Sequence, residues 1–455
     1  MRNRKPTLGP RDVRVAHEPF PRITSVKVGG FKAIAHVQDI RIGSLTVLAG
    51  ANSSGKSSAI QPLLLLKQTA EDPRGGSDLQ LAGSHVLFTD KQQLLAKSSA
   101  AGEKPCLLTI GLTIDGRDSV HQVYDAPNGK PLAVVKAHYS VPRYLPGEFD
   151  LEPGMGMEAI KGALGALFAQ LEQSFKPEAV KVRIERGLLS IILEMNRNDG
   201  VMKLSDGSTQ PSLFFVEMPF RTGFSKALSG IIHVPGVRSN PLRQYDLIPR
   251  RGQVFRGTMD VFVPALLMEW QEEDESKIDL LNEYMVRLGL TSQIKATQDD
   301  DSTVEVRVAR SLSAKSDMVS IADVGFGVSQ VLPVLLALLA AEKNQLVYIE
   351  QPEVHLHPNA QVALANVICE AVERGAQVVM ETHSELMLLS IQTAVARRRL
   401  DPDSVVLHWF TRDVETEESE VCSKSLAPDG SFGPWPEDFS KVTMDAQLEY
   451  IRSIQ

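Results

Sequence analysis

The stretch LTVLAGANSSGKSS, residues 45–58, decides the fold of this chain. Four apolar residues lead into the pattern GxxxxGK[ST], which is filled by Gly50, Gly55, Lys56 and Ser57. The glycines allow a tight loop whose backbone N–H groups point inward at a phosphate, and the following helix adds its positive N-terminal end. The lysine neutralises phosphate charge, and the serine hydroxyl suits Mg²⁺. The stretch therefore predicts a P-loop between a buried strand and a helix.

The far half of the chain carries three further motifs. Residues 325–330, GFGVSQ, open an apolar helix and suggest a second anion site, although a plain helix-capping turn is an equal alternative. The apolar strand 346–349 ends in Glu350, and a carboxylate at that edge of a parallel strand holds Mg²⁺ through water. Another buried strand, 377–380, leads to His383, which would reach a γ-phosphate, although a lone histidine is more often structural. Their order after the P-loop favours one shared site.

In order, GANSSGKS (50–57), VGFGVSQ (324–330), LVYIEQPEVHLHP (346–358) and METHSE (380–385) resemble the ATPase domain of SMC proteins and ABC transporters. The closest resemblance is to prokaryotic OLD-like ATPases of a subgroup without a Toprim nuclease domain. Such proteins occur in anti-phage defence systems. The resemblance implies an α/β fold, an ABC/SMC-type P-loop NTPase core with a mixed sheet and an inserted α+β region.

The same resemblance implies a division of the chain into four parts. They are the N-terminal half of the core with Walker A (1–100), an inserted α+β and helical region (101–310), the C-terminal half of the core with signature, Walker B and switch histidine (311–400), and a strand pair with a helix (401–455).

The resemblance also implies that ATP and Mg²⁺ are sandwiched between two protomers, so that the chain forms a homo-oligomer, at least a dimer. The expected catalytic residues are Glu350, Gln351, Glu353 and His383, and the expected Mg²⁺ ligands are Ser57 and Glu350. The expected ATP contacts are Lys32, Asn52, Ser53, Ser54, Gly55, Lys56, Ser57 and Ser58, with Gly327, Ser329 and Gln330 from the facing protomer.

Gln351 occupies the position of the usual general base. A glutamine amide does not accept a proton from water at neutral pH, whereas a carboxylate does. Either hydrolysis is slow or Glu353 serves as the base. We expect weak but real ATP hydrolysis.

Composition narrows the class of protein. The chain has 455 residues, 43% of them hydrophobic and 23% charged, and a net charge of -8, which describes a globular protein and argues against a whole-surface DNA binder. Cys106, Cys369 and Cys422 lack metal-site spacing and favour a reducing, cytoplasmic location. The longest apolar run, 331–341, is too short to span a bilayer, so no membrane partner is expected.

Two charged features leave alternatives open. Arginines gather at positions 238, 243, 250, 251 and 256, where they suit phosphates or a partner's acids, or form a solvated loop. Residues 1–27 are basic and would make a local, salt-dependent DNA contact. The pair Asp401 and Asp403 precedes a strand instead of ending one, so we interpret it as a turn and predict no intrinsic nuclease.

The leading hypothesis is an oligomeric, slowly hydrolysing ATPase that acts as a sensor or scaffold for a separate effector, a nuclease or toxin, in anti-phage defence. A phage protein would be its trigger, and DNA contact stays open. The alternatives are an SMC-like DNA-binding repair ATPase and a transport ATPase. The first is weakened because no long heptad repeat is present, and the second because no segment for coupling to a permease is recognisable.

Overall fold

The structure is a computed structural model of the chain. It describes residues 18–72, 78–96, 107–126, 131–174, 179–185, 188–203, 209–217, 219–246, 254–300, 302–313, 317–433, 448–449 and 452. Several sequence predictions lie outside these ranges: the first 17 residues of the basic arm, Arg250, Arg251, Cys106 and nearly all of the C-terminal helix.

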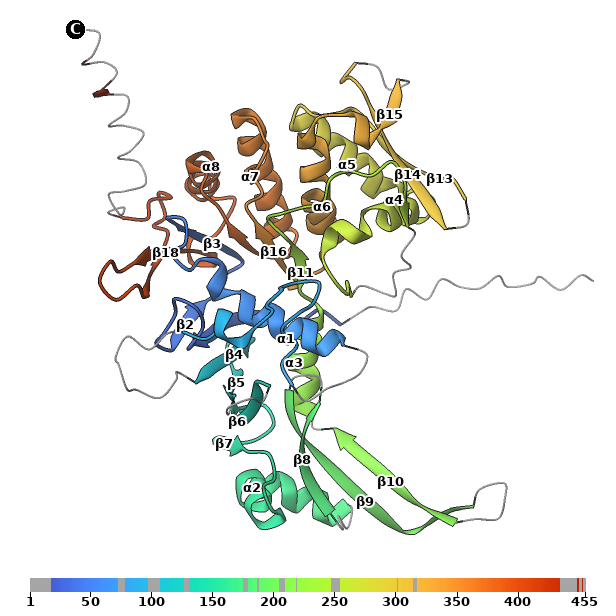
Figure 1. The fold of residues 1–455 in the computed structure, drawn as a ribbon, viewed down its shortest axis with the longest axis vertical. Coiled ribbons are helices and arrows are strands. Elements are labelled where there is room, and N and C mark those ends of the chain that lie inside the picture. The colour runs from blue at the N-terminus through green and yellow to red at the C-terminus, as the bar shows by residue number, and fades with distance from the viewer. Residues whose placement is uncertain are drawn as a thin grey trace, which may run out of the picture.

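The P-loop strand lies inside a six-stranded mixed sheet (Figure 1). In spatial order its strands are β11 (Ile232–Val234), β16 (Leu346–Glu350), β17 (Gln377–Glu381), β3 (Leu45–Gly50), β18 (Val405–Arg412) and β19 (Ser419–Ser425). Neighbouring strands pair in parallel, except that β18 and β19 are antiparallel. Strand β17 therefore separates β16, which ends in Glu350, from the P-loop strand β3.

Helices cover both faces of this core sheet. In Figure 1, α4 (Val263–Glu273), α5 (Glu275–Arg287), α6 (Phe326–Ala340), α7 (Pro358–Glu373) and α8 (Glu385–Ala396) lie on one side, with α1 (Gln61–Glu71) and α3 (Pro219–Ser229) on the other. Val347 and Ile349 of β16 pack into the hydrophobic core formed with α4 to α8, here called the first core. Leu346 and Tyr348 pack into the core formed with α1 and α3, the second core. This alternation follows from the two-residue period of a strand, and burial on both faces explains the continuous apolar runs.

A second, antiparallel sheet packs under α1. Its spatial order is β2 (Gln38–Arg41), β1 (Ile23–Gly29), β4 (Leu108–Ile114), β5 (Asp118–Asp125), β6 (Ala133–Ser140) and β7 (Glu148–Leu151). Its strands β4, β5 and β6 pair antiparallel in chain order. The expected division at residue 100 cuts through this sheet, because β4 pairs with β1 along its length. Likewise β11, expected in the inserted region, is a strand of the core sheet.

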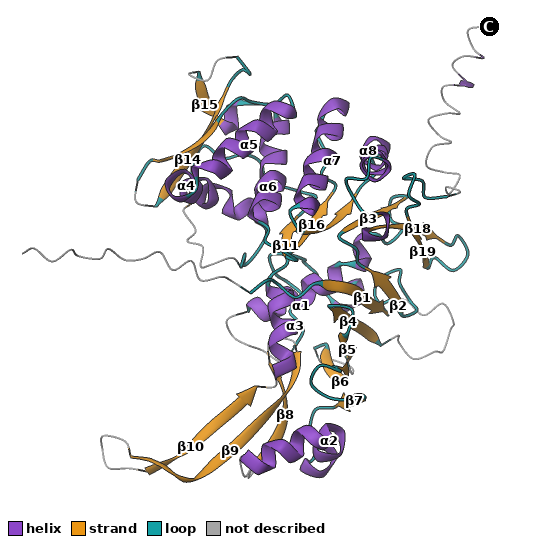
Figure 2. Ribbon diagram, turned by 180° about the vertical axis from the view of Figure 1, so that it is seen from behind, coloured by secondary structure: helices purple, strands orange, loops and turns teal. Residues whose placement is uncertain are grey.

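The inserted region contributes two smaller units. One contains α2 (Met157–Ser174), β8 (Ala179–Glu185), β9 (Leu188–Lys203) and β10 (Thr209–Glu217), and it projects away from α4 to α8 in Figure 2. The other is a small sheet of β12 (Tyr245–Asp246), β13 (Ile294–Gln298), β14 (Thr303–Ala309) and β15 (Met318–Ser320). The α/β class with a mixed core sheet is confirmed. In the described ranges, no helix is both long and apolar enough to cross a lipid bilayer.

Candidate functional site

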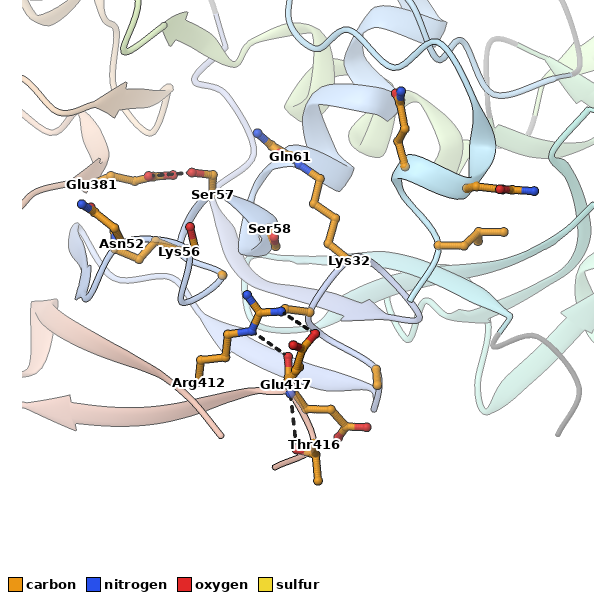
Figure 3. Close-up of a pocket in the computed structure, with 18 of the residues that line it drawn as sticks. Lys32, Asn52, Lys56, Ser57, Ser58, Gln61, Glu381, Arg412, Thr416 and Glu417 are labelled. Atoms are coloured by element: carbon orange, nitrogen blue, oxygen red, sulfur yellow. Dashed lines mark hydrogen bonds and ion pairs between the residues drawn. The ribbon is translucent and has the colours of Figure 1, made fainter. Parts of the chain in front are cut away.

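A cavity of about 770 Å³ opens over the carboxyl ends of β3 and β17 (Figure 3). The P-loop forms its floor with Asn52, Ser53, Gly55, Lys56, Ser57 and Ser58. The other walls include Lys32, Gln61, Gln351, Glu381, His383, Arg412 and the acidic residues 415, 417 and 418. A cavity of this size accommodates a small cofactor.

The P-loop glycines are required by close packing as well as by backbone conformation. Gly50 and Gly55 have φ of 139° and 101°, a region that side chains disfavour. A Cβ on Gly50 would lie 2.2 Å from the Phe410 carbonyl oxygen, and one on Gly55 would lie 2.3 Å from Ser419 Oγ. Strands β18 and β19 therefore hold the loop from behind. Ser419 Oγ also donates a hydrogen bond of 2.6 Å to the Ser54 carbonyl oxygen.

Lys56 is curled over its own loop. Its Nζ donates to the carbonyl oxygens of Gly50 and Ala51 at 3.1 and 2.6 Å. Burial lowers the pKa of Lys56, and the carboxylates of Glu381 and Glu353 oppose that shift. A short 3-10 turn, Ser57–Ala59, follows the lysine before α1 begins at Gln61.

Lys32 supplies a second cation to the cavity. It lies in the turn after β1 with a φ of 50°, which is unusual for a residue with a side chain. Its Nζ donates to Gln61 Oε1 at 2.7 Å and lies 4.8 Å from the centre of the Phe88 ring. Burial lowers its pKa, while Glu350 and Glu381 act in the opposite direction. The expected ATP contact Lys32 thus lies at the cavity wall.

Glu381 is the carboxylate that contacts the P-loop serine. Ser57 Oγ donates to Glu381 Oε2 at 2.8 Å, and the Tyr348 hydroxyl donates to Glu381 Oε1 (Figure 3 shows the first contact). Only 3% of Glu381 is exposed. Burial, followed by the charge of Glu350, raises the pKa of Glu381 to about 7, although hydrogen bonds from Tyr348 and Ser57 oppose that rise. Sequence reasoning missed this residue.

The Glu350 side chain points toward β11 and the loop after it, not toward the P-loop. Its Oε1 lies 3.1 Å from His233 Nε2, and its Oε2 accepts a bond of 3.1 Å from the Gly236 N–H. Arg238 Nη2 donates to its backbone oxygen at 2.8 Å. Burial opposes ionisation, but the His233 hydrogen bond and charge, with Gly236 and Arg238, bring the pKa of Glu350 below its ordinary value. Glu350 does not line the cavity, and the carboxylate that contacts Ser57 is that of Glu381.

A buried polar network continues from Glu350 into the second core. The Nδ1 atoms of His233 and His85 are 3.2 Å apart, and His85 Nε2 lies 3.1 Å from Glu71 Oε2. Lys67 Nζ, fully buried, is 2.7 Å from Glu71 Oε1. Burial lowers the pKa of His85 to about 4, so this imidazole is neutral near neutral pH. The network ties the end of β16 to α1 and to the loop after β11.

The remaining catalytic candidates separate into two groups. Gln351 and His383 line the cavity, and His383 Nε2 is buried with no hydrogen-bond partner in the described structure. Burial and Lys56 lower the pKa of His383. Glu353, in contrast, does not line the cavity; its Oε1 accepts from the His383 N–H at 2.7 Å. Burial raises the pKa of Glu353. Glu353 therefore supports the histidine turn instead of facing the cavity.

The signature residues lie outside the cavity of their own chain. Gly325 precedes α6, which begins at Phe326 as predicted. Gly327, Ser329 and Gln330 are absent from the cavity lining, and the Ser329 hydroxyl is exposed, donating at 3.0 Å to the carbonyl oxygen of Phe326.

Sequence reasoning predicted a strand pair in residues 401–455, which β18 and β19 form, but it missed the contribution of their hairpin to the cavity and the burial of Arg238. Arg412, which lines the cavity, donates from its Nε to the Glu417 carbonyl oxygen at 3.0 Å (Figure 3). Arg238 is 6% exposed, and its Nε and Nη1 have no hydrogen-bond partner in the described ranges. The arginine-rich segment gave a signal for Arg238, but burial was not readable from it. Asp401 caps the short turn before β18, as predicted.

One protein-family model matches part of the chain. Residues 264–390 match a family model described as "AAA domain, putative AbiEii toxin, Type IV TA system". That match covers α4 to α8 and the motifs from GFGVSQ to METHSE. No curated protein matches this sequence.

Three solved structures are similar to the chain. An Smc head bound to the C-winged helix domain of ScpA has 13% identity, a TM-score of 0.41, and 89% of this chain and 98% of that chain covered. An SMC head domain from Thermotoga maritima has 9% identity and a TM-score of 0.37, with 88% and 98% covered. An Smc head with an extended coiled coil, bound to the C-terminal domain of ScpA and derived from Pyrococcus furiosus, has 12% identity and a TM-score of 0.41, with 95% and 100% covered.

The order of the core sheet, the loop at the end of β3 and the AAA-domain match over residues 264–390 agree with an α/β P-loop NTPase fold. The expected fold class is confirmed.

Proposed function

We propose that this protein binds and slowly hydrolyses ATP at a site shared by two copies of the chain. The proposal rests on one observation: the P-loop residues line a cavity, whereas the signature residues of the same chain lie outside it. Lys56, Ser57 and His383 line one cavity, whereas Ser329 is exposed outside it. A second chain that applied its α6 N-terminus to the cavity would complete the site with a hydroxyl and a helix dipole.

The residues of the cavity have distinct roles in this proposal. Lys56, which hydrogen-bonds to two loop carbonyl oxygens, turns to the β- and γ-phosphates when nucleotide enters. Lys32 neutralises further phosphate charge from the opposite wall. The unpartnered His383 Nε2 is available to the γ-phosphate or to the attacking water.

The cavity also suits Mg²⁺. Ser57 and Glu381, which ends β17, offer hydroxyl and carboxylate oxygens, the donors that this cation takes in nucleotide sites. When bound, Mg²⁺ supplies charge neutralisation on the phosphate oxygens. The chain itself orients those phosphates through Lys56 and the loop N–H groups.

Slow turnover follows from Gln351. It lines the cavity at the position where a general base is needed, and its amide orients water without taking a proton. Glu353, two positions further along the chain, does not line the cavity, and its carboxylate is engaged by the His383 N–H. We therefore propose that hydrolysis proceeds without a dedicated carboxylate base facing the water.

Mixed oligomers test the shared site. Lys56→Ala disables a P-loop, and Ser329→Arg blocks an exposed signature without touching the core. Each variant alone is expected to lose phosphate release, whereas an equal mixture recovers about a quarter of the wild-type rate, because half the dimers are mixed and each holds one intact site. A Lys56→Ala/Ser329→Arg double variant mixed with Lys56→Ala is the control and recovers nothing. Absence of recovery in the first mixture, with exchange of subunits demonstrated, contradicts the proposal.

We further propose that nucleotide state controls a separate effector protein, a nuclease or toxin, in anti-phage defence. The resemblance to OLD-like ATPases supports this role. The trigger would be a phage protein, with DNA as a second candidate. Measuring phosphate release with and without each added component tests it: a trigger changes turnover, and an inert component leaves it unchanged.

A further inference from the structure

Two glutamates at neighbouring strand ends could each serve a cation, but only Glu381 lines the cavity. Glu350 and Glu381 are directly opposite each other in the parallel pairing of β16 and β17. Strands lie about 4.8 Å apart, so Glu381, one strand from β3, starts about 5 Å closer to the P-loop than Glu350 does. The order β11-β16-β17-β3 therefore favours Glu381 geometrically.

The carboxylate of Glu350 is committed to the opposite side of its strand. Both of its oxygens are engaged by groups that come from β11 or the loop after it, namely His233 and Gly236. The fit there is close, since a Cβ on Gly236 would lie 3.2 Å from Glu350 Oε2. Arg238 adds a bond to the Glu350 backbone oxygen. Turning Glu350 toward Ser57 would leave a buried imidazole and a backbone N–H without their acceptor, which is costly.

Glu381 has the opposite arrangement. It lines the cavity, and its Oε2 already accepts a hydrogen bond from the Ser57 hydroxyl. The Tyr348 hydroxyl donates to the other oxygen and fixes the rotamer. The Tyr348 ring in turn stacks on His233, with centroids 5.4 Å apart and planes at 15°. One tyrosine therefore keeps the two glutamates apart, each facing its own partners.

We propose that Glu381, together with Ser57, is the protein's divalent-cation site, and that Glu350 is a positioning residue that holds the loop after β11. Mg²⁺ binds through one or two carboxylates, substrate phosphates and water, so one glutamate and one serine suffice when a nucleotide is present. In the described ranges no group of three or more His, Cys, Asp or Glu side chains could hold a metal alone, which agrees with a cation that enters with phosphate. This inference rests on the proposed nucleotide function and assigns its metal ligand.

The test measures how much Mg²⁺ tightens the binding of a non-hydrolysable ATP analogue. Calorimetric affinities for the full-length chain are compared in excess chelator and in excess Mg²⁺, and their ratio is the cation-dependent gain. Glu381→Gln is expected to reduce this gain about tenfold or more while leaving the chelator affinity intact. Glu350→Gln, the matched control, keeps the gain but lowers the melting temperature, because the His233 and Gly236 contacts weaken.

Glu381→Asp provides a second variant with the charge kept and the side chain shortened. It is expected to fall between Glu381→Gln and wild type, and it guards against misfolding of the amide variant. Loss of the gain in Glu350→Gln with retention in both Glu381 variants overturns the assignment. A wild-type chain that binds no analogue under either condition instead contradicts the proposed nucleotide function itself.

Discussion

Glu350 and Glu381 end adjacent parallel strands in the same register, yet their surroundings give them opposite properties. On the β11 side, Glu350 accepts hydrogen bonds from His233 and Gly236, and its pKa lies below the ordinary value despite burial. On the P-loop side, Glu381 is buried beside that charge, and its pKa rises to about 7. One glutamate is built into a donor-rich network, and the other borders a cavity.

The position of a residue in a sequence motif therefore does not determine which contacts its side chain makes. Glu350 occupies the Walker B position of the family that the sequence resembles. The carboxylate that contacts Ser57 is nevertheless that of Glu381, on the neighbouring strand. Burial alone would raise both pKa values. The charges around each carboxylate decide which one ionises readily, because His233 and Arg238 favour the ionised form of Glu350 whereas the charge of Glu350 disfavours that of Glu381. Strand order decides which one faces the P-loop.

The largest expected effect comes from removing the donor on the Glu350 side. His233→Ala leaves the Glu350 and His85 side chains without their shared partner and opens a cavity in the second core. We expect the free energy of unfolding to fall by about 3 kcal/mol. Urea denaturation measures it. His36→Ala, whose side chain is 84% exposed, is the control and should change little. Equal stability of the two variants would mean that the network contributes nothing.

Whether a contact of either glutamate could be predicted depends on how far apart the two contacting residues lie in the sequence. The strand at 45–50, the P-loop and the strands ending in Glu350 and Glu381 were predictable, because each is a local apolar run followed by polar residues. The partners were not. His233 lies 117 positions from Glu350, and Ser57 lies 324 positions from Glu381.

The same reason applies to the parts of the site that sequence reasoning missed. Ser419 reaches Ser54 across 365 positions because β18 and β19 pack beside β3. Arg238 lies in an arginine-rich segment. Its side chain is buried at the end of β16, where it donates to the Glu350 backbone oxygen. Periodicity reports which face of a strand is buried, but it does not report which strands are neighbours.

On the cavity side, the largest effect should follow from Lys56→Ala. The substitution removes the charge that would otherwise meet the β- and γ-phosphates, so affinity for an ATP analogue is expected to fall about 100-fold, or about 2.7 kcal/mol. The free energy of unfolding should hardly change, in contrast to His233→Ala. Calorimetry gives the affinity, with Lys424→Ala on the exposed part of β19 as control. An unchanged affinity would remove the P-loop from nucleotide binding.

A smaller change perturbs Glu350 without deleting any of its partners. Gly236→Ala adds a methyl group 3.2 Å from Glu350 Oε2, so the carboxylate or the loop must shift. We expect a loss of about 1.5 kcal/mol in stability, with nucleotide affinity preserved. Gly156→Ala is the matched control, because its Cβ would meet no atom within 4 Å. If both alanine variants unfold at the same urea concentration, the close fit around Glu350 is not significant.

The smallest expected effect concerns the support behind the P-loop. Ser419→Ala deletes the hydrogen bond of 2.6 Å to the Ser54 carbonyl oxygen but leaves the backbone bond from Ser419 N to the Ala33 carbonyl oxygen. Affinity for the ATP analogue should weaken about fivefold, close to 1 kcal/mol. Ser423→Ala on the same strand, which contacts His408 instead, should leave affinity unchanged. A loss as large as that of Lys56→Ala would assign β19 a direct role in binding.

The most direct measurement is a crystal structure of the chain with Mn²⁺ and a non-hydrolysable ATP analogue, in which anomalous scattering locates the cation. We expect an anomalous peak within about 2.3 Å of Ser57 Oγ and of a Glu381 oxygen, or a peak that reaches the Glu381 oxygen through one water molecule. We also expect Glu350 to remain hydrogen-bonded to His233 and Gly236. A peak ligated by Glu350, with Glu381 turned aside, would contradict this expectation.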